Sequence, residues 1–130
     1  MFNANPVTRR DMTLASIQRE VAMLRDKCCQ RCGGEAQEMS HVYGKGCYPN
    51  EYIKYATINV LMLCNSCHHQ FWHKDTPEAM EWFEGKFGGR YRELRLLVLE
   101  FQNGGTVYPY EIDDIRKGLK KELADIKSTI

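Results

Sequence analysis

The sequence that decides the fold reads Cys29-Gln-Arg-Cys32-Gly33 and, 35 residues further on, Cys64-Asn-Ser-Cys67-His68-His69. Each Cys-x-x-Cys pair places two thiolates on one tight turn, and two such pairs supply the four ligands of a tetrahedral Zn²⁺. A single pair would also suit a redox motif. The double pair predicts a structural zinc site made by Cys29, Cys32, Cys64 and Cys67.

Composition describes one ordinary domain of 130 residues, with 43% hydrophobic and 27% charged residues. No apolar run approaches the roughly 20 residues that a membrane span needs, and the opening MFNANPVTRRDM lacks the apolar stretch of a signal peptide. The six cysteines are therefore expected to bind metal in a reducing cytoplasm rather than to form disulfides. The net charge of +1 means that nucleic-acid binding must depend on local basic clusters, such as 27–31, 86–95 and 116–121.

Apolar periodicity predicts a small α+β domain. Met39–Tyr43 is expected as half of a hairpin whose other half is weakly specified, and Glu51–Tyr55 as a loop or one helical turn. Thr76 is the expected N-cap of a helix that begins at Pro77 and is stopped by Gly88-Gly89. Helices are expected over 13–27, 65–71 or 65–73, 76–87, 91–102 and 111–127. The expected division is an N-terminal arm and helix (1–27), a zinc-centred core (28–75) and a helical extension (76–130).

Three further residues lie among the cysteine pairs in a recognisable order. His41 follows Cys32 by nine residues, Asn59 precedes Cys64 by five, and His68 follows Cys67 directly. This order of His, Asn and His around four cysteines resembles the HNH (ββα-metal) endonucleases over about 40 of the 130 residues. The resemblance implies a zinc-centred, treble-clef-like ββα core with flanking helices.

The same resemblance implies a DNA endonuclease that hydrolyses phosphodiester bonds. Zn²⁺ would be structural, and a second site would hold Mg²⁺, Mn²⁺ or another divalent ion for catalysis. His41 would be the general base, since its ordinary pKa of roughly 6.5 suits proton transfer near neutral pH. His68 would ligate the catalytic metal, and Asn59 would fix the loop backbone or orient His41.

One departure from the family concerns the position before His41. Many members carry a metal-ligating Asp there, whereas this chain has Ser40, a poor ligand for a hard cation. His73 is the expected second histidine ligand, although five residues from His68 is a poor spacing on a regular helix. His69 and His73 are four apart and would share a helix face. Histidine ligands without the Asp favour a softer metal.

The tail from His73 to Phe83 resembles the phage NinG-like recombination nucleases. This resemblance implies DNA, including branched DNA, as partner, in the cytoplasm of a bacterial or phage-infected cell. A resolvase-type nuclease needs two active sites, so a homodimer through the apolar face of 111–127 is one expectation; packing of that face on its own domain is the other. The competing function is a non-catalytic zinc module that binds DNA or protein. Cys28 is an alternative ligand to Cys29; otherwise Cys28 and Cys47 are free thiols.

Overall fold

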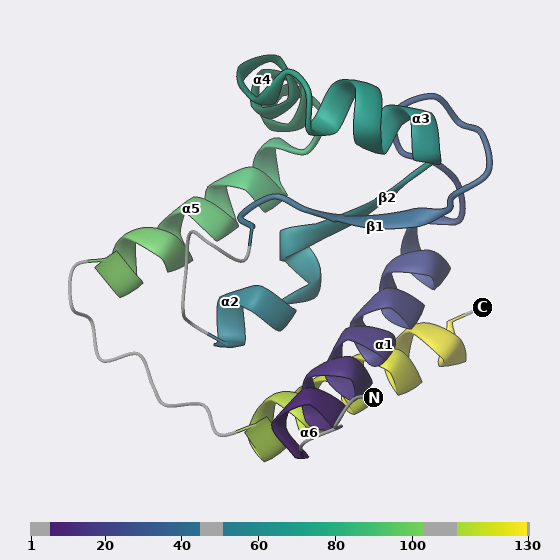
Figure 1. The fold of residues 1–130 in the computed structure, drawn as a ribbon. Coiled ribbons are helices and arrows are strands. Elements are labelled where there is room, and N and C mark those ends of the chain that lie inside the picture. Colours follow the sequence, from purple (N-terminus) through teal and green to yellow (C-terminus); the bar gives the residue numbers. More distant parts are fainter. Residues whose placement is uncertain (1–5, 45–50, 103–111, 130) are drawn as a thin grey trace.

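A small sheet lies between two sets of helices in the computed structural model, which describes residues 6–44, 51–102 and 112–129 (Figure 1). Strands β1 (Glu38–His41) and β2 (Val60–Leu63) pair antiparallel, so the apolar run before the second cysteine pair is the other half of the predicted hairpin. The arrangement agrees with the predicted α+β class. The helical segments, in chain order, are α1 (Pro6–Asp26), α2 (Glu51–Tyr55), the 3₁₀ turn η1 (Thr57–Asn59), α3 (Asn65–Cys67), the π-helical turn η2 (His68–Trp72), α4 (Thr76–Lys86), α5 (Gly88–Gln102) and α6 (Ile112–Ser128).

The two faces of the sheet bury different sets of side chains. Ser40 pairs with Leu61 and His41 with Val60, and because side chains alternate along a strand these two pairs lie on opposite faces. Leu61 belongs to the core formed with η2, α4 and α5, whereas Val60 packs with Ala22 of α1. All four residues of β2 are buried, which explains why this strand reads as an uninterrupted apolar run.

Helix α6 lies along α1 on the outer side of the molecule (Figure 1). Ile115 and Leu119 of α6 pack with Leu14 of α1, and Lys127 Nζ lies 3.2 Å from Glu20 Oε2. The apolar face of α6 is thus used within its own chain, as in the second of the two sequence expectations. The homodimer stays a prediction, which light scattering tests.

A buried ion pair joins the end of α1 to β2. The carboxylate of Asp26 accepts hydrogen bonds from Arg25 Nε (2.7 Å) and from the backbone N–H of Met62 (2.9 Å). Arg25 also donates to the carbonyl oxygens of Thr57 and Val60, both at 2.8 Å. These bonds hold the helix against the strand that leads into the second cysteine pair.

Element boundaries differ from the sequence prediction in three places. Helix α1 begins at Pro6, seven residues before the first predicted helical residue, because residues 6–12 lack the apolar periodicity on which the prediction depended. The N-cap of α4 is Asp75, whose carboxylate accepts from the Glu78 N–H at 3.2 Å. Gly88 starts α5, so the break between helices is at Phe87 alone. Glu51–Tyr55 is helical, which is the second of the two alternatives that the sequence left open.

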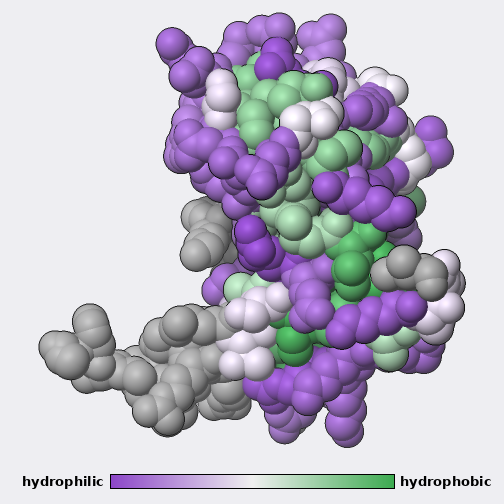
Figure 2. Space-filling view, turned by 90° about the vertical axis from the view of Figure 1, so that its right-hand side faces the viewer, coloured by the Kyte–Doolittle hydropathy of each residue, from purple (hydrophilic) through white to green (hydrophobic). Residues whose placement is uncertain are grey.

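The face of the molecule seen in Figure 2 is mostly hydrophilic, and hydrophobic residues are visible within its upper part and across its middle. Within the described ranges, the helices are all too short or too polar to cross a bilayer.

Candidate metal centres

The two cysteine pairs meet where the loop after α1 reaches the end of β2. Gly33, at a φ of 80°, closes the first turn by donating its N–H to the carbonyl of Cys29 (2.9 Å). The N–H of Gln30 donates to the carbonyl of Met62 (3.0 Å), which anchors this turn on β2. The second turn starts with Cys64 as the N-cap of α3, its sulfur accepting from the Cys67 N–H at 3.4 Å.

The four sulfur atoms form a group of the size that zinc requires. The Sγ atoms of Cys29, Cys32, Cys64 and Cys67 all lie within 4.8 Å of one another. Cys32 Sγ and Cys64 Sγ are 3.7 Å apart, close to the roughly 3.8 Å edge of a tetrahedron with Zn–S distances of about 2.3 Å. The group can therefore hold a zinc ion.

The thiols of this group have unequal proton affinities. Burial alone would raise the pKa of Cys29, but the backbone N–H groups of Cys32, Cys64 and Arg31 bring it down to about 6. Burial raises the pKa of Cys67 to about 12, partly opposed by Arg31, whose Nη1 lies 3.6 Å from that sulfur. Arg31 is the one cation in contact with the group among the described residues, and its guanidinium lies 3.8 Å from the centre of the Phe71 ring.

Cys28 does not belong to the four-sulfur group. Its Sγ lies 4.0 Å from Gln30 Nε2 instead. Of the two adjacent candidates, Cys29 is therefore the one that the structure brings to the other cysteines. Cys47 lies outside the described residues.

A second ligand group lies on the η2 face of the sheet. One ligand atom each of Glu38, His68 and His69 lies within 4.8 Å of the others. Glu38 Oε1 is 3.5 Å from His68 Nε2 and 3.2 Å from His69 Nε2. His73 is not one of these three residues, but its Nε2 lies 3.0 Å from His68 Nε2. Two nitrogens about 2.1 Å from one ion, at right angles, would be about 3.0 Å apart.

The π-helical turn η2 brings His73 to His68. In an α-helix, residues five apart lie about 140° apart around the axis. Here the His73 N–H donates to the carbonyl of His68 at 3.1 Å, an i to i+5 bond that widens the turn and aligns the two side chains. The poor spacing expected for a regular helix is thereby removed.

Ser40 orients His68. Its buried hydroxyl is hydrogen-bonded to His68 Nδ1, which leaves Nε2 pointing toward Glu38 and His73. Burial, and next the charge of His73, lower the pKa of His68 below its ordinary 6.5, while Glu38 opposes the shift. At neutral pH the ring is uncharged, as a metal ligand must be.

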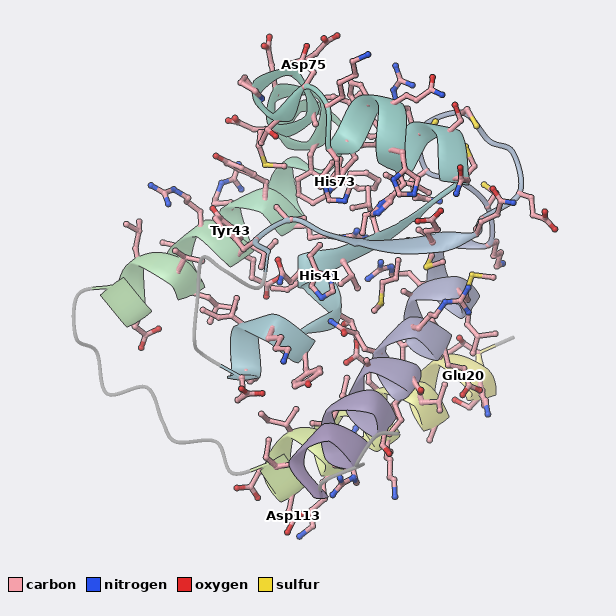
Figure 3. All side chains as sticks on the ribbon, viewed as in Figure 1. Glu20, His41, Tyr43, His73, Asp75 and Asp113 are labelled. Carbon is pink, nitrogen blue, oxygen red and sulfur yellow. The ribbon has the colours of Figure 1, made fainter. Side chains whose placement is uncertain are left out.

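His41 lies on the other face of the sheet. It is the last residue of β1, one position after Ser40, and Figure 3 shows it on the side of α1 and α2, whereas His73 lies on the side of η2. Its carbonyl accepts from Trp72 Nε1 at 3.0 Å. Of the predicted catalytic residues, the structure brings His68 and His73 together but does not bring His41 to them.

Asn59 is fully buried and bonded only to backbone in the contacts described. Its Oδ1 accepts from the Tyr43 N–H (2.8 Å), and its Nδ2 donates to the carbonyls of Tyr43 and Ile53, both at 3.1 Å. These bonds tie the segment that leaves β1 to α2. Fixing the loop backbone was one of the two roles that the resemblance implied.

Glu38 is the site residue that the sequence analysis missed. The available signal was its position two residues before Ser40, because positions 38 and 40 of one strand share a face. Comparisons of the chain with protein-family models, curated proteins and solved structures found no match. The geometry of the two ligand groups therefore carries the functional argument.

Proposed function

We propose that this chain is a metal-dependent DNA endonuclease of the HNH type that hydrolyses phosphodiester bonds. The observation that carries the proposal is the 3.0 Å separation of the His68 and His73 Nε2 atoms on a π-helical turn next to the four-cysteine group. A histidine pair and a closed four-sulfur site, side by side, match the two separate metal functions that the family resemblance implies.

The cysteine group would hold Zn²⁺ as a structural ion. The first cysteine turn, β2 and α3 meet there, and the hydrophobic core beside it includes Cys29 and Cys67 themselves. A core in which two of the buried residues are metal ligands depends on the metal for its stability.

The second ion, Mg²⁺ or Mn²⁺, would neutralise the phosphate and stabilise the leaving oxygen. We place the scissile phosphate across the end of β1, where His41 would approach it from one face of the sheet and His68 and His73 from the other. His41 takes a proton from a water whose oxygen attacks phosphorus; the bond to the leaving oxygen breaks, and that oxygen takes up a proton. Two exposed cations, Arg31 and Lys74, line one pocket beside η2 and would meet phosphates further along the DNA.

The position of His41 favours a second candidate function. Its side chain lies on the α1 face, away from the histidine group, as expected of a zinc module that binds DNA or protein without cutting it. In that case the histidines of η2 would hold a metal or hydrogen bonds without catalysis.

Incubation of the zinc-loaded protein with supercoiled plasmid distinguishes the two functions. The nuclease nicks the plasmid with Mg²⁺, Mn²⁺ or Ni²⁺ and stops when EDTA is added, and His68→Ala purified in parallel excludes a contaminating nuclease. Linear, nicked and four-way DNA in the same assay report the substrate class, branched DNA included. A folded, zinc-loaded protein that cuts none of these with any of the three ions would rule out the nuclease.

A further inference from the structure

Glu38 aims one carboxylate oxygen at the histidine group. Its Oε1 lies 3.2 Å from His69 Nε2 and 3.5 Å from His68 Nε2, and the Glu38 side chain is 29% exposed. Position 38 shares a strand face with position 40, where the family resemblance leads us to expect a carboxylate and this chain has serine. A carboxylate is therefore present on that face, two residues before Ser40 on β1.

Glu38 and His68 are less exposed than His69, and each of the two is held by a hydrogen bond to a polar neighbour. Asn65 Nδ2 donates to Glu38 Oε2, which turns Oε1 toward the histidines. Ser40 holds His68 Nδ1 in the same way and leaves Nε2 turned toward Glu38. Metal ligands are commonly oriented by such hydrogen bonds to the atom that does not touch the ion. A surface ion pair would need neither of them.

We infer that Glu38 is the carboxylate ligand of the second metal site, together with His68 and His69, and that this site binds Mn²⁺ or a similar transition-metal ion in preference to Mg²⁺. The inference rests on the proposed function in that it concerns the metal of the same site. His73, at 3.0 Å from His68 Nε2, can add a further nitrogen.

The ligand set determines the metal preference. Mg²⁺ prefers oxygen ligands and keeps several of its waters, whereas imidazole nitrogens suit transition metals. Two histidines and one carboxylate combine nitrogen and oxygen in a set that Mn²⁺ accepts. Ser40 contributes no ligand to this set, because its hydroxyl is bonded to His68 Nδ1, on the opposite edge of the ring from Nε2.

A Mn²⁺ titration of the full, zinc-loaded chain, followed by the electron paramagnetic resonance signal of free Mn²⁺, tests the inference without reference to DNA cleavage. We expect the wild type to bind one Mn²⁺ in addition to zinc, and an equal concentration of Mg²⁺ to leave it bound. Glu38→Gln should weaken Mn²⁺ binding at least about ten-fold, since changes to outer hydrogen bonds alone cost about 10- to 100-fold. His69→Ala should weaken it as well.

Glu84→Gln is the matched control, because Glu84 is an exposed glutamate on α4 with no interaction with the histidine group. It should bind Mn²⁺ like the wild type. Zinc content and thermal melting establish that each variant is folded, and the exposed His69 allows a second test if Glu38→Gln misfolds.

Two outcomes overturn the inference: no Mn²⁺ binding by the folded wild type, or wild-type Mn²⁺ affinity in folded Glu38→Gln (in His69→Ala, should Glu38→Gln misfold). The second outcome would leave Glu38 and His69 as an ion pair only. If Mn²⁺ binds through Glu38 and no DNA is cut, the nuclease proposal fails and the metal site stands. If DNA is cut while Glu38→Gln binds Mn²⁺ normally, the metal-site inference fails and the nuclease proposal stands.

Discussion

The Nε2 atoms of His68 and His73 lie 3.0 Å apart although the two residues are five positions apart in sequence. The π-helical bond from the His73 N–H to the His68 carbonyl produces this approach. π-Turns inside helices occur frequently at functional sites. The histidine pair, rather than either histidine alone, is therefore the candidate metal-binding unit of η2.

Replacing either histidine of this pair should shift the Mn²⁺ requirement of plasmid nicking. We expect His68→Ala to need more Mn²⁺ than His73→Ala, because His68 is also bonded to Ser40 and adjacent to Glu38, whereas His73 is exposed. The nicking rate measured against Mn²⁺ concentration gives the midpoint for each variant. Midpoints equal to that of the wild type would remove both residues from the metal site.

His41→Ala should lower the rate of plasmid nicking and leave the affinity for metal ions unchanged. A general base contributes about 10²- to 10⁴-fold to the rate. His41 lies on the face opposite His68, so Mn²⁺ affinity and zinc content should stay at wild-type values. Single-turnover nicking at saturating Mn²⁺ measures the loss, which added Mn²⁺ should not restore. Full cleavage by this variant would leave the nuclease in place without its proposed base.

Cys67→Ser should abolish stoichiometric zinc and unfold or aggregate the protein. Cys67 is a buried core residue as well as a member of the four-sulfur group, so its loss removes both the ligand and the folding energy of metal binding. Cys28→Ser is the control one residue from a ligand, and it should retain one zinc per chain with an unchanged melting temperature. Metal analysis and circular dichroism report both. An intact fold for Cys67→Ser would contradict a structural role for the site.

Zinc binding should release protons and weaken as the pH falls. Burial raises the pKa of Cys67 to about 12. The Gly34 N–H lowers the pKa of Cys32, but the neighbouring thiols of Cys29 and Cys64 outweigh it and raise that pKa above its ordinary value. Both sulfurs are therefore protonated near pH 7 in the metal-free protein and must lose their protons to bind zinc. Two released protons imply an affinity that falls about 100-fold per pH unit.

Calorimetry in two buffers of different ionisation enthalpy counts the protons directly. We expect at least two per zinc at pH 7, and the dissociation constant measured with a competing chelator should rise as the pH falls from 8 to 6. Fewer than one proton per zinc would show that these cysteines are thiolates before the metal arrives.

Asp26→Ala should destabilise the fold by about 3 kcal/mol. The change leaves Arg25 without its carboxylate and the Met62 N–H without its acceptor at a site where the Asp26 side chain is 2% exposed. Asp113→Ala removes an exposed ion pair with Arg116 and should change little. Urea unfolding of both zinc-loaded variants gives the comparison. Equal effects would mean that the buried pair contributes no more than a surface one.

Much of this architecture could be read from the chain. The spacing within each cysteine pair predicts the four-sulfur group because a tight turn determines how far apart its two thiolates lie. Periodicity along 111–127 predicts a helix with one buried face, which α6 has. Local patterns of this kind depend on residues a few positions apart. They can therefore be predicted without knowing which segments pack against them.

Which segments pack against these elements is known only from the tertiary structure. Whether α6 packs on α1 or on another copy depends on contacts between segments about a hundred residues apart. The sequence gives no sign of the role of Asp26, because that role depends on β2 passing close enough to donate the Met62 N–H to its carboxylate. Helix α1 likewise extends to Pro6 without the periodicity that marks its later turns.

The histidine group shows the same division. The chain alone shows that His68 and His73 lie close to a cysteine pair in sequence, and that Ser40 and His41 must point to opposite faces of any strand that contains both. Three further features depend on the folded chain: a π-turn aligns the two histidines, β1 brings Glu38 to His68, and His41 faces α1. The physical reason is that helix type and strand register are selected by the packing of Phe71 and Trp72 against the sheet, a sum of long-range contacts that no short motif encodes.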